Sequence, residues 1–363
     1  MDPKVTPPKP SPSTQNSGIL AILALGCVGA FVAGFFLSDL LKNQTQSSPP
    51  VSTGTSPTPT MSQGVTQTGS GISAVDSLSF ATGLHYFDDT VLAITTDTPR
   101  KIFIGSMVRV EDEPNMYVHN TRVSFFDGET WTRKTGSARS NTSAITTSAL
   151  ISAWNIDIDA TRVLRERVSG KAQVDTHSIQ FFAPDLQNEM SVRSLPGYTK
   201  FMSEGDGTIT IQGKKHAAKV LYTRIYSMNT ADIQFYSEPI GVTTDWVAFW
   251  DTAGNFYHVD ATSVAKPTAI YKSHTLGIHL SPSGAVSKTF SVQTTRDTNI
   301  PPDKYSISIG NPIGSTLDLT RKNAINKAPN GAYDWYLGEV EGTVSHDGQT
   351  PLSGYGVVEY IHD

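Results

Sequence analysis

Turn-forming dipeptides recur after residue 76, and β-branched or alternating runs lie beside them. The runs include GTITIQG, DWVAFWD and YSISIG, and the dipeptides are Asp127-Gly128, Asp206-Gly207, Gly254-Asn255, Asn330-Gly331 and Asp347-Gly348. Dipeptides of this kind adopt the tight turns that join antiparallel strands. No long amphipathic helical period occurs in the same region. The sequence therefore predicts an all-β fold after residue 76.

The strand-rich part of the chain is long enough for two domains. It spans about 290 of the 363 residues, whereas a typical domain uses about 100–150. We therefore predict two β-modules, one at residues 76–235 and one at 236–363.

An apolar segment precedes the strand-rich part. Residues 18–41 read GILAILALGCVGAFVAGFFLSDLL and contain no charged residue before Asp39. About 20 apolar residues cross the hydrocarbon core of a bilayer, so we predict a transmembrane helix at 18–41. A polar, proline-rich tail occupies 1–17. The Ser/Thr/Pro-rich linker at 42–75 has too few apolar side chains to form a core.

Two other interpretations of the apolar segment are weaker. A cleavable signal peptide has a shorter apolar region, about 7–15 residues, behind a basic start. Ala24-Leu25-Gly26-Cys27 loosely resembles a lipobox, but the apolar stretch continues past Cys27, where a lipoprotein would turn polar. We therefore retain the membrane span.

Charges near the span predict its orientation. Lys4 and Lys9 precede it and Lys42 follows it, so the positive-inside bias places the N-terminus in the cytoplasm and the β-modules outside, in an extracellular or periplasmic space. Small residues spaced four apart, Gly26, Ala30 and Gly34, would let two such helices approach closely and dimerise. Ordinary small residues of a membrane helix are the simpler explanation for that spacing.

Charge and residue usage argue against several classes of site. The chain has 28 Lys and Arg against 33 Asp and Glu, a formal net charge of −5, so it offers no basic excess to a nucleic acid. Its single cysteine, Cys27, excludes a thiolate metal cluster. His274 and His279 are five residues apart, which places them on opposite faces of a strand. With no Walker loop or dinucleotide fingerprint in the strand-rich part, we predict neither a metal nor a cofactor.

The last 28 residues, YLGEVEGTVSHDGQTPLSGYGVVEYIHD, predict a glycine-rich hairpin. By the two-residue period of a strand, Val340 and Val344 share one face with two glycines, while Glu339 lies on the other. On the return strand, Glu359 lies on the face opposite Val358. Glycine repeated within a strand marks a bulge, a sharp coil or the close approach of another backbone. Tightly coiled barrel strands have these properties.

This ending resembles the terminal signature of the AttH and hydroxyneurosporene-synthase-like family, which includes carotenoid 1,2-hydratases and related fungal hydratases and pericyclases. The residues that fit the signature in order are Asp347, Gly348, Pro351, Leu352, Gly354, Gly356, Val358 and Glu359. Weaker similarities reach back to about residue 195. The resemblance implies two lipocalin-like barrels packed around an apolar pocket. The chain departs from the family pattern at Thr223, where an Asp is common, and at Glu339, which comes one residue late.

The resemblance and the residue chemistry together nominate site residues. A carboxyl group in an apolar barrel is shifted toward its neutral form and can act as a general acid. Glu359 and Glu339 are the candidates, and a solvated outer face is the ordinary alternative for both. Thr223 stands at the acidic position, but a hydroxyl cannot protonate an alkene as a carboxylic acid can. Arg224 would orient a charge, and Tyr222 and Tyr226 would stabilise a cation through their π faces.

Aromatic residues around one hairpin complete the prediction. Trp246, Phe249 and Trp250 would line a pocket for an apolar or ring-bearing ligand. Because the acidic position is lost at Thr223, the sequence favours binding over catalysis and leaves a hydratase or isomerase activity open. The first hypothesis is a membrane-anchored double barrel that binds an isoprenoid- or lipid-like molecule. The alternative is a stalked all-β surface module for protein or glycan contacts.

Overall fold

The computed structural model describes residues 86–113, 116–140, 155–158, 168–195, 198–227, 241–266, 273–327 and 334–362. Within these ranges every regular element is a β-strand, which confirms the all-β prediction. None of the described residues forms a helix long and apolar enough to cross a bilayer. The segments predicted at 1–17, 18–41 and 42–75 lie outside the described residues.

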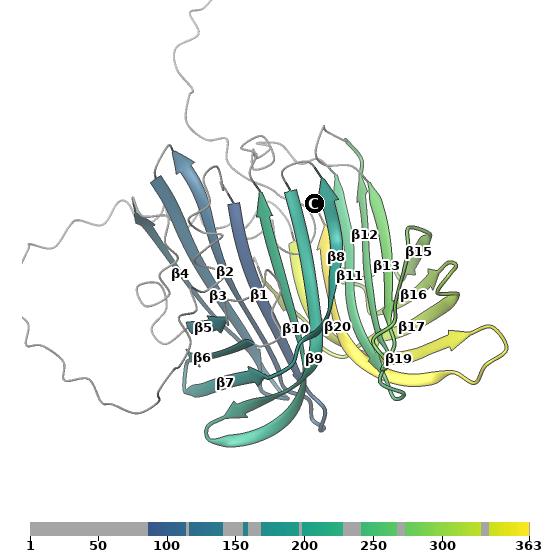
Figure 1. Ribbon diagram of the computed structural model, residues 1–363, viewed down its shortest axis with the longest axis horizontal. Coiled ribbons are helices and arrows are strands. Elements are labelled where there is room, and N and C mark those ends of the chain that lie inside the picture. The colour runs from purple at the N-terminus through teal and green to yellow at the C-terminus, as the bar shows by residue number, and fades with distance from the viewer. Residues whose placement is uncertain are drawn as a thin grey trace, which may run out of the picture.

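The first ten strands form one antiparallel sheet, coloured blue to teal in Figure 1. They are β1 (Tyr86–Thr95), β2 (Ile102–Glu113), β3 (Met116–Phe126), β4 (Trp131–Ser140), β5 (Asn155–Ile158), β6 (Val168–Val174), β7 (His177–Ala183), β8 (Gln187–Leu195), β9 (Tyr198–Ile211) and β10 (Lys214–Ser227). Their order is β4-β3-β2-β1-β10-β9-β7-β6-β5, with β8 paired to β9. The strands that come first and last in this part of the chain, β1 and β10, therefore pair. Contacts of β3 and β4 with β6 bring the sheet edges together into a nearly closed barrel.

The second ten strands repeat this arrangement. They are β11 (Val242–Asp251), β12 (Phe256–Val264), β13 (His274–Leu280), β14 (Val286–Thr289), β15 (Val292–Arg296), β16 (Lys304–Ile309), β17 (Ser315–Arg321), β18 (Ile325–Asn326), β19 (Asp334–His346) and β20 (Leu352–His362). Their order is β14-β13-β12-β11-β20-β19-β17-β16-β15, with β18 paired to β19. Each strand number equals that of its counterpart in the first sheet plus ten. The chain thus contains two barrels of the same topology.

Three predicted turns are confirmed. Asp127-Gly128 lies between β3 and β4, Gly254-Asn255 between β11 and β12, and Asp347-Gly348 between β19 and β20. Their glycines have φ values of 108°, 86° and 73°. A side chain is strained in that region of φ, so glycine is preferred there.

One predicted turn is wrong, and another, Asn330-Gly331, lies outside the described residues. Asp206-Gly207 lies within β9, and the chain turns later at Gln212-Gly213. Gly207 serves a close approach between strands: a Cβ there would lie 2.6 Å from the carbonyl oxygen of Phe182.

The glycines of the closing hairpin have the role that the sequence predicted. A Cβ on Gly342 would lie 2.0 Å from the carbonyl oxygen of Asp318, and one on Gly356 would lie 2.0 Å from that of Ala248. Neighbouring strands therefore approach more closely than any side chain allows. Val340 and Val344 share one face, as the two-residue period predicted, and that face points into the second barrel.

Among the residues that the structure describes, buried apolar side chains form three clusters. One occupies the interior of the first barrel and includes Phe103 and Tyr222. Another occupies the interior of the second barrel and includes Phe249. The third draws on both barrels, with Leu92 from the first and Trp250 from the second. Figure 1 shows β9 and β10 beside β11 and β20 in the middle of the molecule. The two barrels therefore share an apolar interface.

Candidate functional site between the two barrels

The face of the second barrel that meets the first is an ordered grid of side chains. Residues directly opposite on paired strands point to the same face. One row contains Asp260, Trp246, Glu359 and Leu337, on β12, β11, β20 and β19. The rows on either side contain Thr262, Thr244, Ile361 and Trp335, and His258, Ala248, Val357 and Glu339. The next row beyond His258 contains Phe256, Trp250, Tyr355 and Glu341.

Charged and polar residues gather in one part of this interface. We call them the inter-barrel polar cluster: Asp88, Arg122 and Lys200 from the first barrel, and Trp246, His258, Asp260, Lys327, Trp335 and Glu359 from the second. Each is at most 4 % exposed. Buried charges are rarely there for stability alone, since removal from water costs about as much as pairing returns. A buried group of charges and perturbed pKa values is therefore a candidate functional site.

One ion pair in the cluster joins the barrels. Lys200 Nζ of β9 lies 3.2 Å from Asp260 Oδ2 of β12. The imidazole of His274 lies 3.3 Å from the other carboxylate oxygen, measured from Nε2. Burial alone would raise the pKa of Asp260, but the charge of Lys200 outweighs it and holds that pKa far below its ordinary value. Asp260 is therefore ionised at neutral pH.

A second ion pair lies beside Trp335. Lys327 Nζ donates to Glu359 Oε1 and lies 3.8 Å from the centre of the Trp335 ring. The guanidinium carbon of Arg122, from the first barrel, lies 4.8 Å from the same ring centre. Burial lowers the pKa of Lys327 to about 8, although Glu359 opposes the shift. Burial likewise lowers the pKa of Arg122 to about 10.

His258 is held as a neutral imidazole. Its Nδ1 lies 2.9 Å from the carbonyl oxygen of Val247. Because a carbonyl only accepts, Nδ1 carries the proton and Nε2 has a free lone pair. Burial, with a further contribution from the charge of Lys200, lowers the pKa of His258 to about 4. The ring also makes an edge contact with Trp246, with 5.2 Å between centroids.

The cluster retains hydrogen-bonding capacity. Buried polar atoms with no hydrogen-bond partner among the described residues include Glu359 Oε2, His258 Nε2, Trp246 Nε1 and Trp335 Nε1. Leaving one such atom unsatisfied costs about 1–3 kcal/mol. Several of them in one place are characteristic of a site that receives ordered water or a bound molecule.

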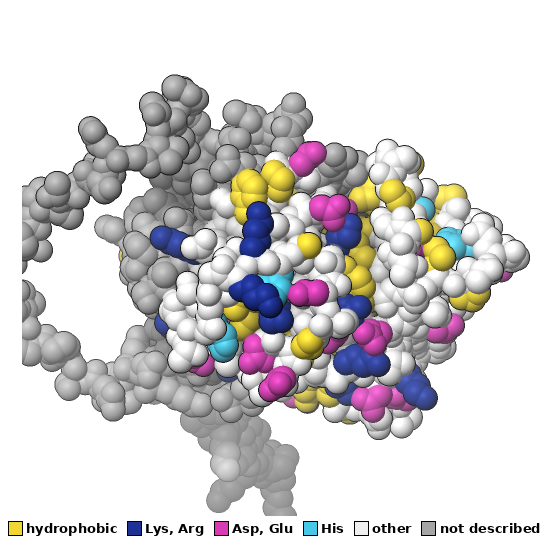
Figure 2. All heavy atoms as spheres, turned by 90° about the horizontal axis from the view of Figure 1, so that it is seen from below, with side chains coloured by type: hydrophobic (Ala, Val, Ile, Leu, Met, Phe, Trp, Pro, Cys, Tyr) yellow, Lys and Arg dark blue, Asp and Glu magenta, His cyan; other side chains and the backbone are white. Residues whose placement is uncertain are grey.

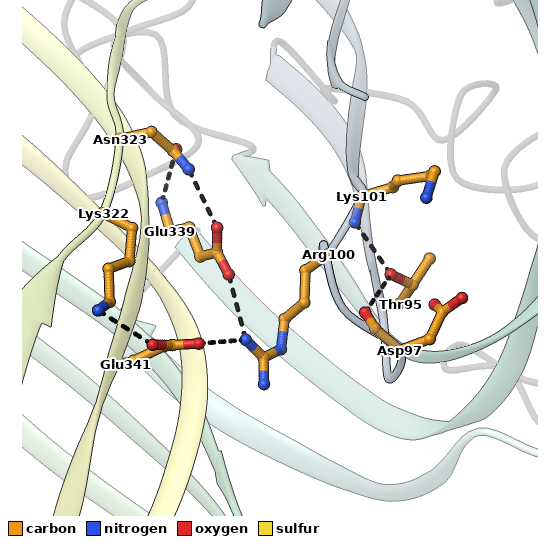
Figure 3. A network of polar contacts seen from close by, with 8 residues as sticks. All are labelled: Thr95, Asp97, Arg100, Lys101, Lys322, Asn323, Glu339 and Glu341. Carbon is orange, nitrogen blue, oxygen red and sulfur yellow. Dashed lines mark hydrogen bonds and ion pairs between the residues drawn. The ribbon is translucent and has the colours of Figure 1, made fainter. Parts of the chain in front are cut away.

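Away from the polar cluster, further hydrogen bonds dock the barrels. Trp250 Nε1 donates to Glu204 Oε1 at 2.8 Å. Arg100, which lies between β1 and β2, reaches Glu339 Oε1 at 3.3 Å and Glu341 Oε1 at 2.5 Å through Nη1, as Figure 3 shows. Asn323 Nδ2 also donates to Glu339, at 3.0 Å. These contacts fix the barrels relative to one another beside the apolar part of the interface.

Each barrel has an ion pair on a buried aspartate of its inner face, fully buried in the first barrel and partly exposed at Arg296 in the second. In the first barrel, Asp89 Oδ1 accepts from Tyr222 Oη and Arg224 Nε, both at 2.7 Å, and Oδ2 accepts from Arg224 Nη2 at 2.8 Å. Burial lowers the pKa of Arg224, but Asp89 outweighs it, so the pKa lies above its ordinary value. In the second barrel, Asp245 pairs with Arg296. Neither interior is a purely apolar calyx.

Comparison with solved structures identifies the architecture. A protein of Nitrosomonas europaea described as AttH superimposes with a TM-score of 0.52 at 14 % identity, over 81 % of this chain and 97 % of its own. Kievitone hydratase of Nectria haematococca gives a TM-score of 0.50 at 14 % identity, over 76 % of this chain and 89 % of its own. The chain has the double-barrel fold of these two proteins. The resemblance seen in the closing hairpin is thus confirmed at the level of the fold.

No protein-family model and no curated protein matches the sequence of the chain. At this low identity, the structural similarity shows the fold alone. One fold serves many unrelated ligands, so the function has to be argued from the site.

Three of the predicted catalytic candidates lie in the interface. Glu359 is fully buried and Glu339 is 7 % exposed, so a solvated outer face is the wrong interpretation for both. The second barrel turns that face toward the first barrel instead of toward water. Thr223, 5 % exposed, lies beside Thr90 and Met202 in the opposing face. Arg224 does not join them, since it faces the interior of the first barrel.

The predicted ligand-binding aromatics separate into three places. Trp246 and Trp250 lie in the interface. Tyr222 lies inside the first barrel and Phe249 inside the second. Tyr226 belongs to β10, but its side chain is outside the described part of the chain. Of the four aromatics whose side chains the structure describes, the two tryptophans alone share a face.

Sequence reasoning missed most of the charged members of the polar cluster. His258 and Asp260 alternate in YHVDA beside the predicted aromatic hairpin, so the two-residue period was a usable signal for both. Lys200, Arg122 and Lys327 are isolated cations in the sequence. Nothing near them in the chain indicates burial.

Two surface hollows lie apart from the cluster. One, of about 380 Å³, is lined by Phe182, Gln180 and Lys171 among others, on β6, β7 and β9. The other, of about 420 Å³, lies on β15, β16 and β17 beside Tyr305. Both are formed largely by outward-facing polar residues.

Proposed function

We propose that the protein binds an apolar, isoprenoid- or lipid-like small molecule between its two barrels. The observation that carries this proposal is a group of buried polar atoms, at Glu359, Trp246, Trp335 and His258, that have no hydrogen-bond partner within the described part of the chain. They adjoin an apolar interface that includes Trp250 and Phe256. A few convergent polar groups beside apolar and aromatic side chains are the usual composition of a small-molecule site.

Binding fits the carboxylates better than acid catalysis does. Glu359 accepts a hydrogen bond from Lys327, and Glu339 accepts from Arg100 and Asn323. Burial raises the pKa of Glu339 against the opposing effect of Arg100, but both of its carboxylate oxygens already accept hydrogen bonds from Arg100 and Asn323. Thr223 supplies no acid in the opposing face. The fold is shared with kievitone hydratase, but this chain's own residues support a binding protein.

The test is native mass spectrometry of the full-length chain, incubated with a lipid extract in detergent and measured before and after organic extraction. We expect a discrete bound mass that extraction removes. Trp246→Phe and Glu359→Gln should reduce its occupancy, whereas Phe182→Ala on the outer hollow should not. A protein that carries no additional mass from several extracts would refute the proposal.

A second candidate function rests on the outer hollow of the first barrel. Phe182 is 38 % exposed there, beside the polar side chains Gln180, Lys171 and Thr208. An exposed aromatic ring with hydrogen-bonding neighbours suits a protein or glycan contact. This alternative predicts the reverse pattern in the variants: Phe182→Ala abolishes binding, and the interface variants do not.

We also propose that residues 18–41 anchor the chain in a membrane, with the N-terminus cytoplasmic and the barrels outside. The length of the apolar run and the lysines before it support this proposal. The spacing of Gly26, Ala30 and Gly34 supports a helix-mediated dimer. Carbonate extraction of membranes and protease protection of intact cells test the anchor and its orientation. Chemical crosslinking in membranes tests the dimer, which Ala30→Leu should weaken.

We propose no nucleic-acid partner. The net charge of −5 gives no attraction to a phosphate backbone. On the face seen in Figure 2, acidic and basic side chains are interspersed among the described residues.

A further inference from the structure

We propose that the molecule bound between the barrels presents a hydroxyl group, as an alcohol or a phenol, to Glu359 and Trp246. This inference rests on the proposed function and narrows it from any apolar molecule to one with a neutral group that both donates and accepts a hydrogen bond. Charge, hydrogen-bonding capacity and position each support it.

The charges of the inter-barrel polar cluster are balanced. Its acids are Asp88, Asp260 and Glu359, and its cations are Arg122, Lys200 and Lys327. The pKa of His258 is about 4, so this side chain adds no charge at neutral pH. A carboxylate or phosphate on the ligand would leave a net negative charge in a buried site, and an ammonium would leave a net positive one. The site therefore favours a neutral group.

The remaining hydrogen-bonding atoms are of both kinds. An indole nitrogen only donates, so Trp246 Nε1 and Trp335 Nε1 require an acceptor. The oxygen Glu359 Oε2 and the unprotonated Nε2 of His258 require a donor. A ketone or an ether satisfies only the indoles. A hydroxyl oxygen accepts from an indole and donates to the carboxylate at once.

The strand register places donor and acceptor within reach of one atom. Trp246 and Glu359 are direct partners on β11 and β20, so their Cβ atoms are about 4.5–5.5 Å apart. Trp335 lies in the adjoining row, and Lys327 contacts both it and Glu359. One hydroxyl between Trp246 and Glu359 would thus accept a hydrogen bond from the indole nitrogen and donate one to the carboxylate.

The same rows of side chains on the second barrel would orient the apolar part of the ligand. Beyond the row of Trp246 and Glu359 lie Ala248 and Val357, and then Trp250 and Phe256. All four of these side chains belong to the apolar cluster between the barrels. A ligand anchored by its hydroxyl would extend along these rows.

The experiment is equilibrium dialysis of the full-length protein in micelles, with protein-free micelles as the blank for partitioning. Two matched probe series separate the head groups: 1-naphthol, 1-methoxynaphthalene and 1-naphthoic acid, and farnesol, farnesyl methyl ether and farnesoic acid. We expect the hydroxyl compound to bind at least about tenfold more tightly than the ether and the acid in one series, because a buried acceptor left unpaired penalises the ether.

Variants locate the effect. Glu359→Gln can turn an amide N–H toward the ligand, so it should reduce the preference for the alcohol over the ether. Trp246→Phe should weaken the alcohol and the ether alike, since both accept from the indole. Glu129→Gln, a matched change at an exposed turn residue, should alter neither. Thermal unfolding of each variant verifies that it is folded.

The possible outcomes distinguish the hydroxyl inference from the proposed binding function on which it rests. Equal binding of the alcohol, ether and acid would overturn the hydroxyl inference and leave the binding proposal standing. A hydroxyl preference that survives both interface variants would overturn its placement at Glu359 and Trp246. Failure of all six probes to bind above the micelle blank would overturn both proposals.

Discussion

Lys200 and Asp260 form a buried ion pair that joins the two barrels, with 3.2 Å between Nζ and Oδ2. The two residues are 1 % and 2 % exposed. The pair lies beside His258, whose pKa the charge of Lys200 helps to lower. A contact between the barrels therefore helps to set the protonation state of a residue in the proposed site.

Breaking this pair from one side should be costly. Lys200→Met leaves the Asp260 carboxylate buried without its lysine, beside His274, and we expect the free energy of unfolding to fall by about 3–5 kcal/mol. The double variant Lys200→Met/Asp260→Leu removes both charges and should recover most of the loss. Thermal and denaturant unfolding of the full-length protein measure this. A double variant no more stable than the single one would contradict the account.

His258 predicts a specific loss of stability in acid. Its pKa is about 4 in the folded protein against an ordinary 6.5, so between these values the unfolded chain binds a proton that the folded protein does not. Stability from this residue is present above pH 6.5 and is lost as the pH falls to 4, by about 3 kcal/mol in all. His258→Asn keeps a donor for the Val247 carbonyl and cannot titrate, so it should lack this loss.

The comparison of His258→Asn with the wild type isolates the histidine. Burial raises the pKa of Glu204 and of Asp245, and those shifts act in the opposite direction because the folded protein protonates first. The wild type and His258→Asn share the shifts of Glu204 and Asp245, so these shifts cancel in the comparison. Parallel curves of unfolding free energy between about pH 4 and 6.5 would show that His258 is not buried and neutral.

Glycine substitutions test the close packing of the closing hairpin. Gly356→Ala places a Cβ 2.0 Å from the carbonyl oxygen of Ala248, and we expect a loss of about 3 kcal/mol or more. Gly348→Ala is the control, because Gly348 has open space around it and only a positive φ of 73°. That change should cost about 1 kcal/mol. Equal losses would contradict the close approach of β20 to β11.

The Arg100 contacts in Figure 3 predict unequal roles for two neighbouring glutamates. Glu339 has a side chain 9 % exposed, whereas that of Glu341 is 39 % exposed. Glu339→Ala leaves Asn323 and the partly buried Arg100 without this carboxylate, so we expect a loss of about 2–3 kcal/mol. Glu341→Ala removes a solvated pair and should cost less than about 1 kcal/mol. A larger effect at Glu341 would refute the assignment.

Short-range rules predicted the strands and the faces of the closing hairpin. Val340 and Val344 point inward because side chains alternate along a strand. The same rule separates His274, which contacts Asp260, from His279, which contacts Asn255. It failed at Asp206-Gly207, where glycine serves a close contact with β7 instead of a turn.

The site itself depends on contacts that no local pattern encodes. Glu339 and Glu359 lie on the outer face of their barrel, as alternation predicts, but that face is covered by the other barrel. Arg224 finds Asp89 at a sequence separation of 135 residues. Lys200 meets Asp260 at a separation of 60. Arg224 and Asp89 are partners on neighbouring strands of the first barrel, whereas Lys200 and Asp260 meet only because the two barrels pack against one another.

Hydrogen–deuterium exchange of the full-length protein, before and after organic removal of bound lipid, tests the central claim most directly. We expect faster exchange after removal in β11 and β20, the strands of Trp246 and Glu359, with β6 and β7 unchanged. Unchanged exchange in β11 and β20, or a change confined to the strands beside Phe182, would contradict a ligand site between the barrels.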